Sequence, residues 1–84
     1  MKTILVTGGC GFIGSNFIHH VIKTHTYNIV NLDKLTYAGN LMNLASVSKD
    51  RHLLVRGDIC DKDFLESLFN RYEFHSVVHF AAES

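Results

Sequence analysis

Four of the six glycines in this 84-residue chain gather in one short stretch, directly after the first apolar segment. The stretch Thr7–Gly14 reads Thr-Gly-Gly-Cys-Gly-Phe-Ile-Gly, which contains G-x-G-x-x-G from Gly9 and G-x-x-G-x-x-G from Gly8, both ending at Gly14 through Gly11. Such a loop turns tightly and directs backbone N–H groups towards a pyrophosphate at the start of a helix, whose dipole favours negative charge. We expect a side chain at Gly11 to obstruct that approach, and Gly14 to let the helix pack closely on a sheet. The alternative is a tight strand-to-helix turn that binds nothing.

An aspartate stands where dinucleotide-binding proteins carry an acidic residue. Asp33 ends the second apolar segment, about 20 residues after Gly14. A carboxylate there accepts hydrogen bonds from adenosine ribose hydroxyls and repels a 2′-phosphate, which favours NAD over NADP. The neighbouring Lys34 is a cation that partly offsets that repulsion. The phosphate-loop motif of ATPases fails, because Ser15 rather than lysine follows Gly14.

Other polar and small residues give weaker signals. Asp58 follows the third apolar segment, where its carboxylate could accept a hydrogen bond from an adenine amino group or could cap a turn; spacing leaves both open. Ala81 and Ala82 follow the fourth apolar segment, and their small side chains would let a cofactor approach closely. The six histidines have no ligand spacing supported by cysteine or carboxylate partners, so we expect no metal site.

Strands and helices must alternate to position these residues. Helical spacing of apolar residues predicts a first helix after the glycines and a second one that Asp61 caps. Their apolar stripes are Ile13, Phe17, Ile18, Val21 and Ile22, and Phe64, Leu65, Leu68, Phe69 and Tyr72. A loop is expected over 36–40, then a short helix with Leu41, Leu44 and Val47. The predicted strands are Thr3–Thr7, Asn28–Leu32, His52–Arg56 and Ser76–Phe80.

This alternation predicts an α/β fold, a Rossmann-type doubly wound parallel sheet with right-handed crossovers and strand order 3-2-1-4. Ligands of such sheets bind at the carboxyl ends of the strands where the strand order reverses. The loops that should meet there are 8–14 and 80–84.

Composition excludes several classes of protein. A hydrophobic content of 46% and a charged fraction of 19% favour a packed core over disorder. Eight basic and eight acidic residues balance, which argues against binding to nucleic acid or an anionic membrane. The two cysteines, Cys10 and Cys60, lack zinc-site spacing, and no apolar run has the length of a signal or membrane segment. We therefore expect a soluble protein of the reducing cytoplasm.

Several of these motifs together resemble a known family. The glycine stretch resembles the opening of extended short-chain dehydrogenase/reductases, and Asn31–Leu41 (Asn-Leu-Asp-Lys-Leu-Thr-Tyr-Ala-Gly-Asn-Leu) is similar to the more specific signature of dTDP-glucose 4,6-dehydratases. The segments 57–61 (Gly-Asp-Ile-Cys-Asp) and 79–84 (His-Phe-Ala-Ala-Glu-Ser) match the same pattern, so the resemblance to the N-terminal part of that family covers essentially the whole chain.

The resemblance implies a lyase in which tightly held NAD takes hydride from sugar C4, water leaves across C5 and C6, and the hydride returns at C6. By the same resemblance, Phe12 and Ile13 line the cofactor loop, and Asp58 and Ile59 flank adenine. The adenosine ribose is held by Asp33, Lys34, Leu35 and Thr36. The nicotinamide half lies beside Phe80, Ala81, Ala82, Glu83 and Ser84, with Ser84 nearest the nucleotide-sugar substrate. Cys10 replaces a common alanine, and its small thiol should fit but be open to oxidation.

The catalytic pair of the resembled family is absent from the chain. That pair is Tyr-x-x-x-Lys, whereas Tyr27, Tyr37 and Tyr72 are followed four positions later by Asn31, Leu41 and Ser76. We therefore expect residues 1–84 to be an incomplete NAD-binding domain, inactive alone, with the catalytic and nucleotide-sugar-binding parts beyond Ser84. Related NDP-sugar epimerases or decarboxylases, and a non-catalytic dinucleotide-binding or interaction module, remain alternatives. A homodimer is a further possibility implied by the resemblance.

Overall fold

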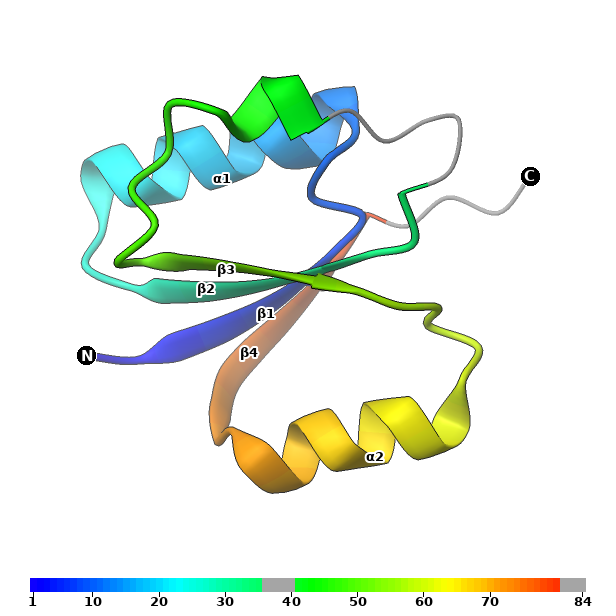
Figure 1. The fold of residues 1–84 in the computed structure, drawn as a ribbon. Coiled ribbons are helices and arrows are strands. Elements are labelled where there is room, and N and C mark those ends of the chain that lie inside the picture. The colour runs from blue at the N-terminus through cyan, green and yellow to red at the C-terminus, as the bar shows by residue number, and fades with distance from the viewer. Residues whose placement is uncertain (36–40, 81–84) are drawn as a thin grey trace.

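A computed structural model describes residues 1–35 and 41–80, which form a parallel sheet between two helices (Figure 1). The strands are β1 (Thr3–Thr7), β2 (Asn28–Asp33), β3 (His52–Arg56) and β4 (Phe74–His79). The helices are α1 (Phe12–Thr24) and α2 (Lys62–Arg71), and a 3₁₀ turn, η1, spans Leu41–Leu44. The order β3-β2-β1-β4 confirms the predicted doubly wound α/β fold. The predicted loop 36–40 lies outside the described residues.

The two central strands are buried on both faces, as their apolar sequences predict. Alternate side chains of β1 enter different cores: Ile4 and Val6 pack with Ile18 and Val21 of α1, whereas Leu5 packs with Leu68 of α2. The helices therefore cover opposite faces of the sheet, as Figure 1 shows. This alternation follows from the two-residue period of a strand.

Helix α1 begins at Phe12 and buries a narrower face than the sequence predicts. The prediction that Ile13 joins the apolar stripe is wrong: Ile13 is 67% exposed, and the adjacent Phe12 is 78% exposed. Gly14, Ser15, Ile18 and Val21 are the buried residues of the helix. The first turn of α1 therefore presents two large apolar side chains at the carboxyl edge of the sheet, where the predicted site lies.

The C-terminal end of α1 is held by Arg51, a residue that no sequence motif had indicated. The Arg51 guanidinium, before β3, donates to the carbonyl oxygens of Ile22 (2.9 Å), Tyr27 (2.9 Å) and His25. A cation that bonds the last carbonyl groups of a helix also complements its dipole. Arg51 thereby ties the α1–β2 connection to the segment that enters β3.

Helix α2 follows the predicted N-cap, since Asp61 Oδ1 accepts a hydrogen bond from the Phe64 amide (3.1 Å). Leu68 is its buried residue, and the expectation that Phe69 is also a core residue is wrong, because Phe69 is 50% exposed and packs edge-on against Phe74. Strand β4 begins two residues earlier than predicted and ends at His79 rather than Phe80. A register shift against β1 leaves one residue, His75, without a partner between the Thr3–Phe74 and Ile4–Ser76 pairs.

Candidate functional site

Three loops converge at the carboxyl edge of the sheet, and backbone hydrogen bonds join them. The Gly8 amide donates to the Leu32 carbonyl at the end of β2 (2.9 Å), and the Gly57 amide donates to the Asp33 carbonyl (3.1 Å). The Phe80 amide, just after β4, donates to the Thr7 carbonyl (2.8 Å). The strand ends that were predicted to meet therefore do meet. A shallow hollow lined by Thr3, Asn28 and Arg51, among others, lies at the opposite edge and is not part of this site.

The N–H groups from Gly8 to Gly11 are already bonded to the protein. Gly9 donates to Asn31 Oδ1 (3.0 Å), Cys10 donates to Asp33 Oδ2 (2.8 Å), and Gly11 donates to the Gly8 carbonyl (3.3 Å). Together with the Gly8 bond, these interactions use all four amides from Gly8 to Gly11. These four amides are therefore occupied within the protein, contrary to the expectation that the glycine loop directs its N–H groups towards a ligand.

The open amides lie one step further, in the first turn of α1. Gly11 is the N-cap but makes no side-chain cap, and the first turn carries no acidic residue. Within residues 1–35 and 41–80, no acceptor bonds the N–H groups of Phe12, Ile13 or Gly14. These three donors and the positive end of the helix dipole form a place for an anion.

The glycines are required for different reasons. Gly8 has φ 72°, a left-handed conformation that side chains disfavour. A Cβ at Gly14 would meet the Gly8 carbonyl oxygen and lie 2.9 Å from the Gly9 Cα, so the close contact at Gly14 is with the glycine loop and not, as the sequence predicts, with the sheet. Gly11, by contrast, has φ −74° and ψ 175°, which any residue can adopt. Its backbone conformation therefore does not explain a glycine at position 11.

Asp33 joins the glycine loop to the turn that follows β2. Its buried carboxylate accepts from the Cys10 amide through Oδ2 and from the Leu35 amide through Oδ1, both at 2.8 Å. Leu35 has φ 59°, a strained conformation for a branched side chain, and its bond to Asp33 stabilises that turn. Each carboxylate oxygen retains a second lone pair, so Asp33 can still accept from a ligand hydroxyl.

A buried polar network beneath the loop was missed by the sequence reasoning. Asn31 is fully buried in β2; its Oδ1 binds the Gly9 amide, and its Nδ2 lies 3.2 Å from His52 Nε2 and 3.7 Å from Cys10 Sγ. Burial, with a smaller effect of His19, lowers the pKa of His52 below its ordinary 6.5. A neutral imidazole can accept from Asn31 through Nε2, which fits this geometry. An asparagine within an otherwise apolar strand was the available signal, because a buried amide requires partners.

The expectation that the Cys10 thiol is open to oxidation is not supported. Cys10 is fully buried, and burial together with the nearby Asp33 charge raises its pKa to about 11. The thiolate is the reactive form of cysteine, so this thiol stays protonated and inert at neutral pH. Cys10 is a packing residue that fits the space beneath the loop, as expected.

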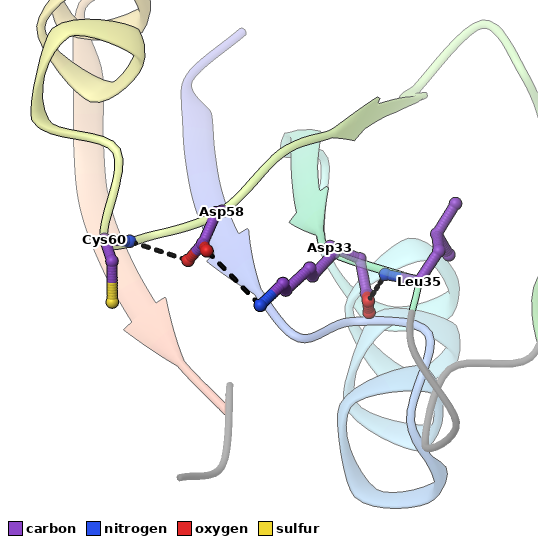
Figure 2. Close-up of polar contacts among 5 residues, drawn as sticks. Asp33, Leu35, Asp58 and Cys60 are labelled. Carbon is purple, nitrogen blue, oxygen red and sulfur yellow. Dashed lines mark hydrogen bonds and ion pairs between the residues drawn. The ribbon is translucent and has the colours of Figure 1, made fainter.

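Asp58 lies beside the Asp33 turn, on the loop after β3 (Figure 2). Its Oδ1 accepts from the Cys60 amide (2.9 Å), and its Oδ2 lies 3.3 Å from Lys34 Nζ. The Cys60 hydrogen bond, and then Lys34, lower the pKa of Asp58, so this carboxyl is ionised at neutral pH. The turn role that spacing left open is therefore present, and it leaves the carboxylate at the edge of the site. Ile59 packs against the core on the α2 side.

The remaining predicted site residues divide between described and undescribed parts of the chain. Phe80 is half-buried, and its ring packs against Phe17 of α1 with centroids 5.2 Å apart. The positions outside the described residues are Thr36, Ala81, Ala82, Glu83 and Ser84. In the described part, no helix is long and apolar enough to cross a membrane.

Comparison with known proteins identifies the relatives of this chain. The family model described as GDP-mannose 4,6 dehydratase matches residues 5–84. The chain belongs to this dehydratase family. Among curated members, the dTDP-glucose 4,6-dehydratase of Neisseria gonorrhoeae is 49% identical over 84 residues, which cover 99% of this chain and 24% of that protein. The resemblance to dTDP-glucose 4,6-dehydratases seen in the sequence is thereby confirmed.

Solved structures of dehydratases and an epimerase share the fold. The crystal structure of dTDP-glucose 4,6-dehydratase from Bacillus anthracis in complex with NAD matches with TM-score 0.92 and 44% identity, covering 99% of this chain and 27% of that one. The UDP-Glc/GlcNAc 4-epimerase of Campylobacter jejuni matches with TM-score 0.86 and 32% identity, over 99% of this chain and 25% of that one. The chain thus spans about a quarter of the length of these three proteins.

Proposed function

We propose that this chain is the NAD-binding portion of a nucleotide-sugar dehydratase that converts dTDP-glucose to its 4-keto-6-deoxy product. The match to a dTDP-glucose 4,6-dehydratase at 49% identity, against 32% for a nucleotide-sugar 4-epimerase of the same fold, supports a dehydratase over an epimerase. The neighbour from Bacillus anthracis was solved with NAD, which supports NAD as the cofactor. When bound, NAD would accept a hydride from the sugar and later return it.

The observation that carries this proposal is the uncapped first turn of α1 beside the Asp33 carboxylate. The free amides of Phe12, Ile13 and Gly14 suit a diphosphate, while Asp33 retains lone pairs for ribose hydroxyls. The extended backbone at Gly11 has no local need for glycine, which fits close approach of a ligand to that position. The residues present therefore fit a dinucleotide.

The rest of the dinucleotide would lie along the carboxyl edge of the sheet. In this proposal, Lys34, Leu35 and Thr36 lie with Asp33 along the adenosine ribose, and Asp58 and Ile59 flank adenine beyond β3. Across the switch in strand order, the nicotinamide half lies beside Phe80 and residues 81–84, and Ser84 is nearest the sugar. Two exposed apolar side chains, Phe12 and Ile13, would lose solvent contact when the cofactor binds.

Titration of the chain with NAD in a calorimeter tests the site. We expect saturable binding by the wild-type chain and its loss in Gly11→Val and Asp33→Ala. Gly11→Val keeps a backbone conformation that valine adopts readily, so circular dichroism should show a folded variant. Absence of binding by a well-folded wild-type chain would contradict the proposal and favour a non-catalytic interaction module.

We further propose that the chain does not turn over dTDP-glucose by itself, because the sequence holds no Tyr-x-x-x-Lys pair. In the whole protein, residues 1–84 would be the cofactor domain, the catalytic pair and nucleotide-sugar site would lie beyond Ser84, and the protein would be a cytoplasmic homodimer. Formation of the keto sugar by the 84-residue chain with NAD would contradict this part of the proposal.

A further inference from the structure

The Lys34–Asp58 ion pair connects the turns after β2 and β3 at the edge of the proposed cofactor site (Figure 2). Lys34 directly follows Asp33, the residue that would meet the ribose of NAD. An ammonium group free to turn towards that ribose would attract the 2′-phosphate of NADP, whereas the Asp33 carboxylate would repel it. The position of the Lys34 ammonium group therefore affects the affinity for NADP relative to NAD.

Asp58 is the fixed member of the pair. Its Oδ1 accepts from the Cys60 amide (2.9 Å), and its own carbonyl accepts from the Asp61 amide (3.0 Å) at the start of α2. The Lys34 side chain is 63% exposed, and its one hydrogen-bonding or ionic contact among the described residues is with Asp58. A long flexible cation adjusts to a held carboxylate more easily than the reverse, so Asp58 determines the position of the Lys34 charge.

The pair has little to do with stability. Both side chains are substantially exposed, and exposed ion pairs of this kind add little to the free energy of unfolding. Its consequence is the placement of charge: the exposed Arg56 lies opposite Asp33 in the register of β2 with β3, so two carboxylates and two cations balance at this edge. The position of the Lys34 ammonium then decides whether a 2′-phosphate beside Asp33 meets one cation or two.

We propose that Asp58 is a positioning residue for cofactor choice: it holds the Lys34 ammonium on the turn after β3, so that this ammonium is not free to neutralise a 2′-phosphate beside Asp33. This inference rests on the proposed NAD site. It assigns discrimination against NADP to three residues acting together rather than to Asp33 alone.

Asp58→Asn tests the inference with little change in shape. Asparagine keeps an oxygen for the Cys60 amide but removes the charge that holds Lys34. The 84-residue variant is titrated with NAD and with NADP at low and high salt. We expect NADP affinity relative to NAD to rise about tenfold at low salt, the size expected when one ammonium group moves to within roughly 8 Å of a phosphate at an effective dielectric constant of about 30, and to rise much less at about 0.5 M salt.

The ratio of NADP affinity to NAD affinity separates the effect on the 2′-phosphate from the other effects of the substitution. Both cofactors carry the same adenine and diphosphate, so a changed adenine contact or a loosened turn alters both affinities and cancels in the ratio. Adding Lys34→Gln to Asp58→Asn should return the ratio close to the wild-type value, because the freed cation is then gone. Asp50→Asn, at the other end of β3, is the matched control and should leave the ratio unchanged.

The outcomes separate this inference from the proposed function. If the wild-type chain and Asp58→Asn both bind NAD and their NADP-to-NAD ratios agree within twofold at low salt, the positioning role is wrong and the NAD site stands. A persistent rise in the double variant also overturns it, since Lys34 would not be the cause. If the folded wild-type chain binds neither cofactor, the proposed function fails and this inference fails with it.

Discussion

Replacing Asp33 with asparagine should destabilise the fold even when no cofactor is present. The two carboxylate oxygens accept from two backbone amides, those of Cys10 and Leu35, at 2.8 Å each. Asparagine offers one acceptor oxygen, and its NH₂ group would face the second amide donor. The substitution therefore breaks one charge-assisted hydrogen bond, weakens the other, and leaves an N–H group unsatisfied near a buried loop.

The expected loss follows from those two bonds. Removing one partner of a hydrogen bond to a charged group costs about 1.5–3 kcal/mol, and weakening the second adds to it, so we expect about 2–4 kcal/mol. This is a large share of the stability of a chain of this size. Urea unfolding followed by circular dichroism should show a midpoint lower by about 1–2 M with an unchanged slope.

A matched control separates loss of these hydrogen bonds from loss of charge. Asp50→Asn makes the same chemical change at an exposed position before β3 and should shift stability by no more than about 0.5 kcal/mol. If Asp33→Asn unfolds at the same urea concentration as wild type, the Asp33 carboxylate does not hold the glycine loop to the turn after β2.

Three further substitutions test other parts of the structure. Because burial lowers the pKa of His52 from 6.5, the unfolded state takes up a proton more readily than the folded state. The free energy of unfolding should therefore be highest above about pH 6.5 and fall as the pH drops towards the lowered pKa. Urea midpoints measured from about pH 5 to about pH 7.5 should vary less with pH in His52→Gln than in wild type. Arg51→Lys keeps the charge but loses the planar fork and should cost about 1–3 kcal/mol in urea unfolding, whereas exposed Arg56→Lys should cost almost nothing. Gly14→Ala would gain about 1 kcal/mol from helix propensity alone, but its Cβ meets the Gly8 carbonyl, so we expect net thermal destabilisation and weaker NAD binding; a higher melting temperature would contradict the packing at Gly14.

The strands could be predicted from local sequence, and their order could be predicted because alternating strands and helices favour the doubly wound topology. Segments such as Thr3–Thr7 are short, β-branched and bounded by glycine, and His52–Arg56 was predicted with the bounds that the structure shows. Solvent exposure of apolar residues could not be predicted in the same way. Helical spacing indicates that Ile13 and Phe69 are apolar, but which of them a neighbouring element covers depends on the packing of distant parts of the chain.

In the site, residue spacing predicts which residues take part but not the hydrogen bonds that join them. Spacing identified Asp33 and the glycine stretch, yet it could not show that the Asp33 carboxylate bonds to Cys10, 23 positions away in the chain. The contact between Asn31 and His52 depends on the parallel register of β2 with β3, in which Ile29 lies opposite His52. Such a register follows from the assembled sheet and has no signature in either segment alone.

The hydrogen bonds of the loop explain how a flexible glycine segment can be a precise binding element. Asn31 and Asp33 are two residues apart on one strand, and they hold the consecutive amides of Gly9 and Cys10. Two adjacent anchors fix both position and orientation of the loop, and hence the direction in which α1 begins. The amides that remain open are then aimed by residues that need not touch the ligand. A substitution at Asn31 should therefore weaken cofactor binding by changing the geometry of the loop. Gly11→Val should weaken binding by a different route, because its added side chain occupies the space that the ligand needs.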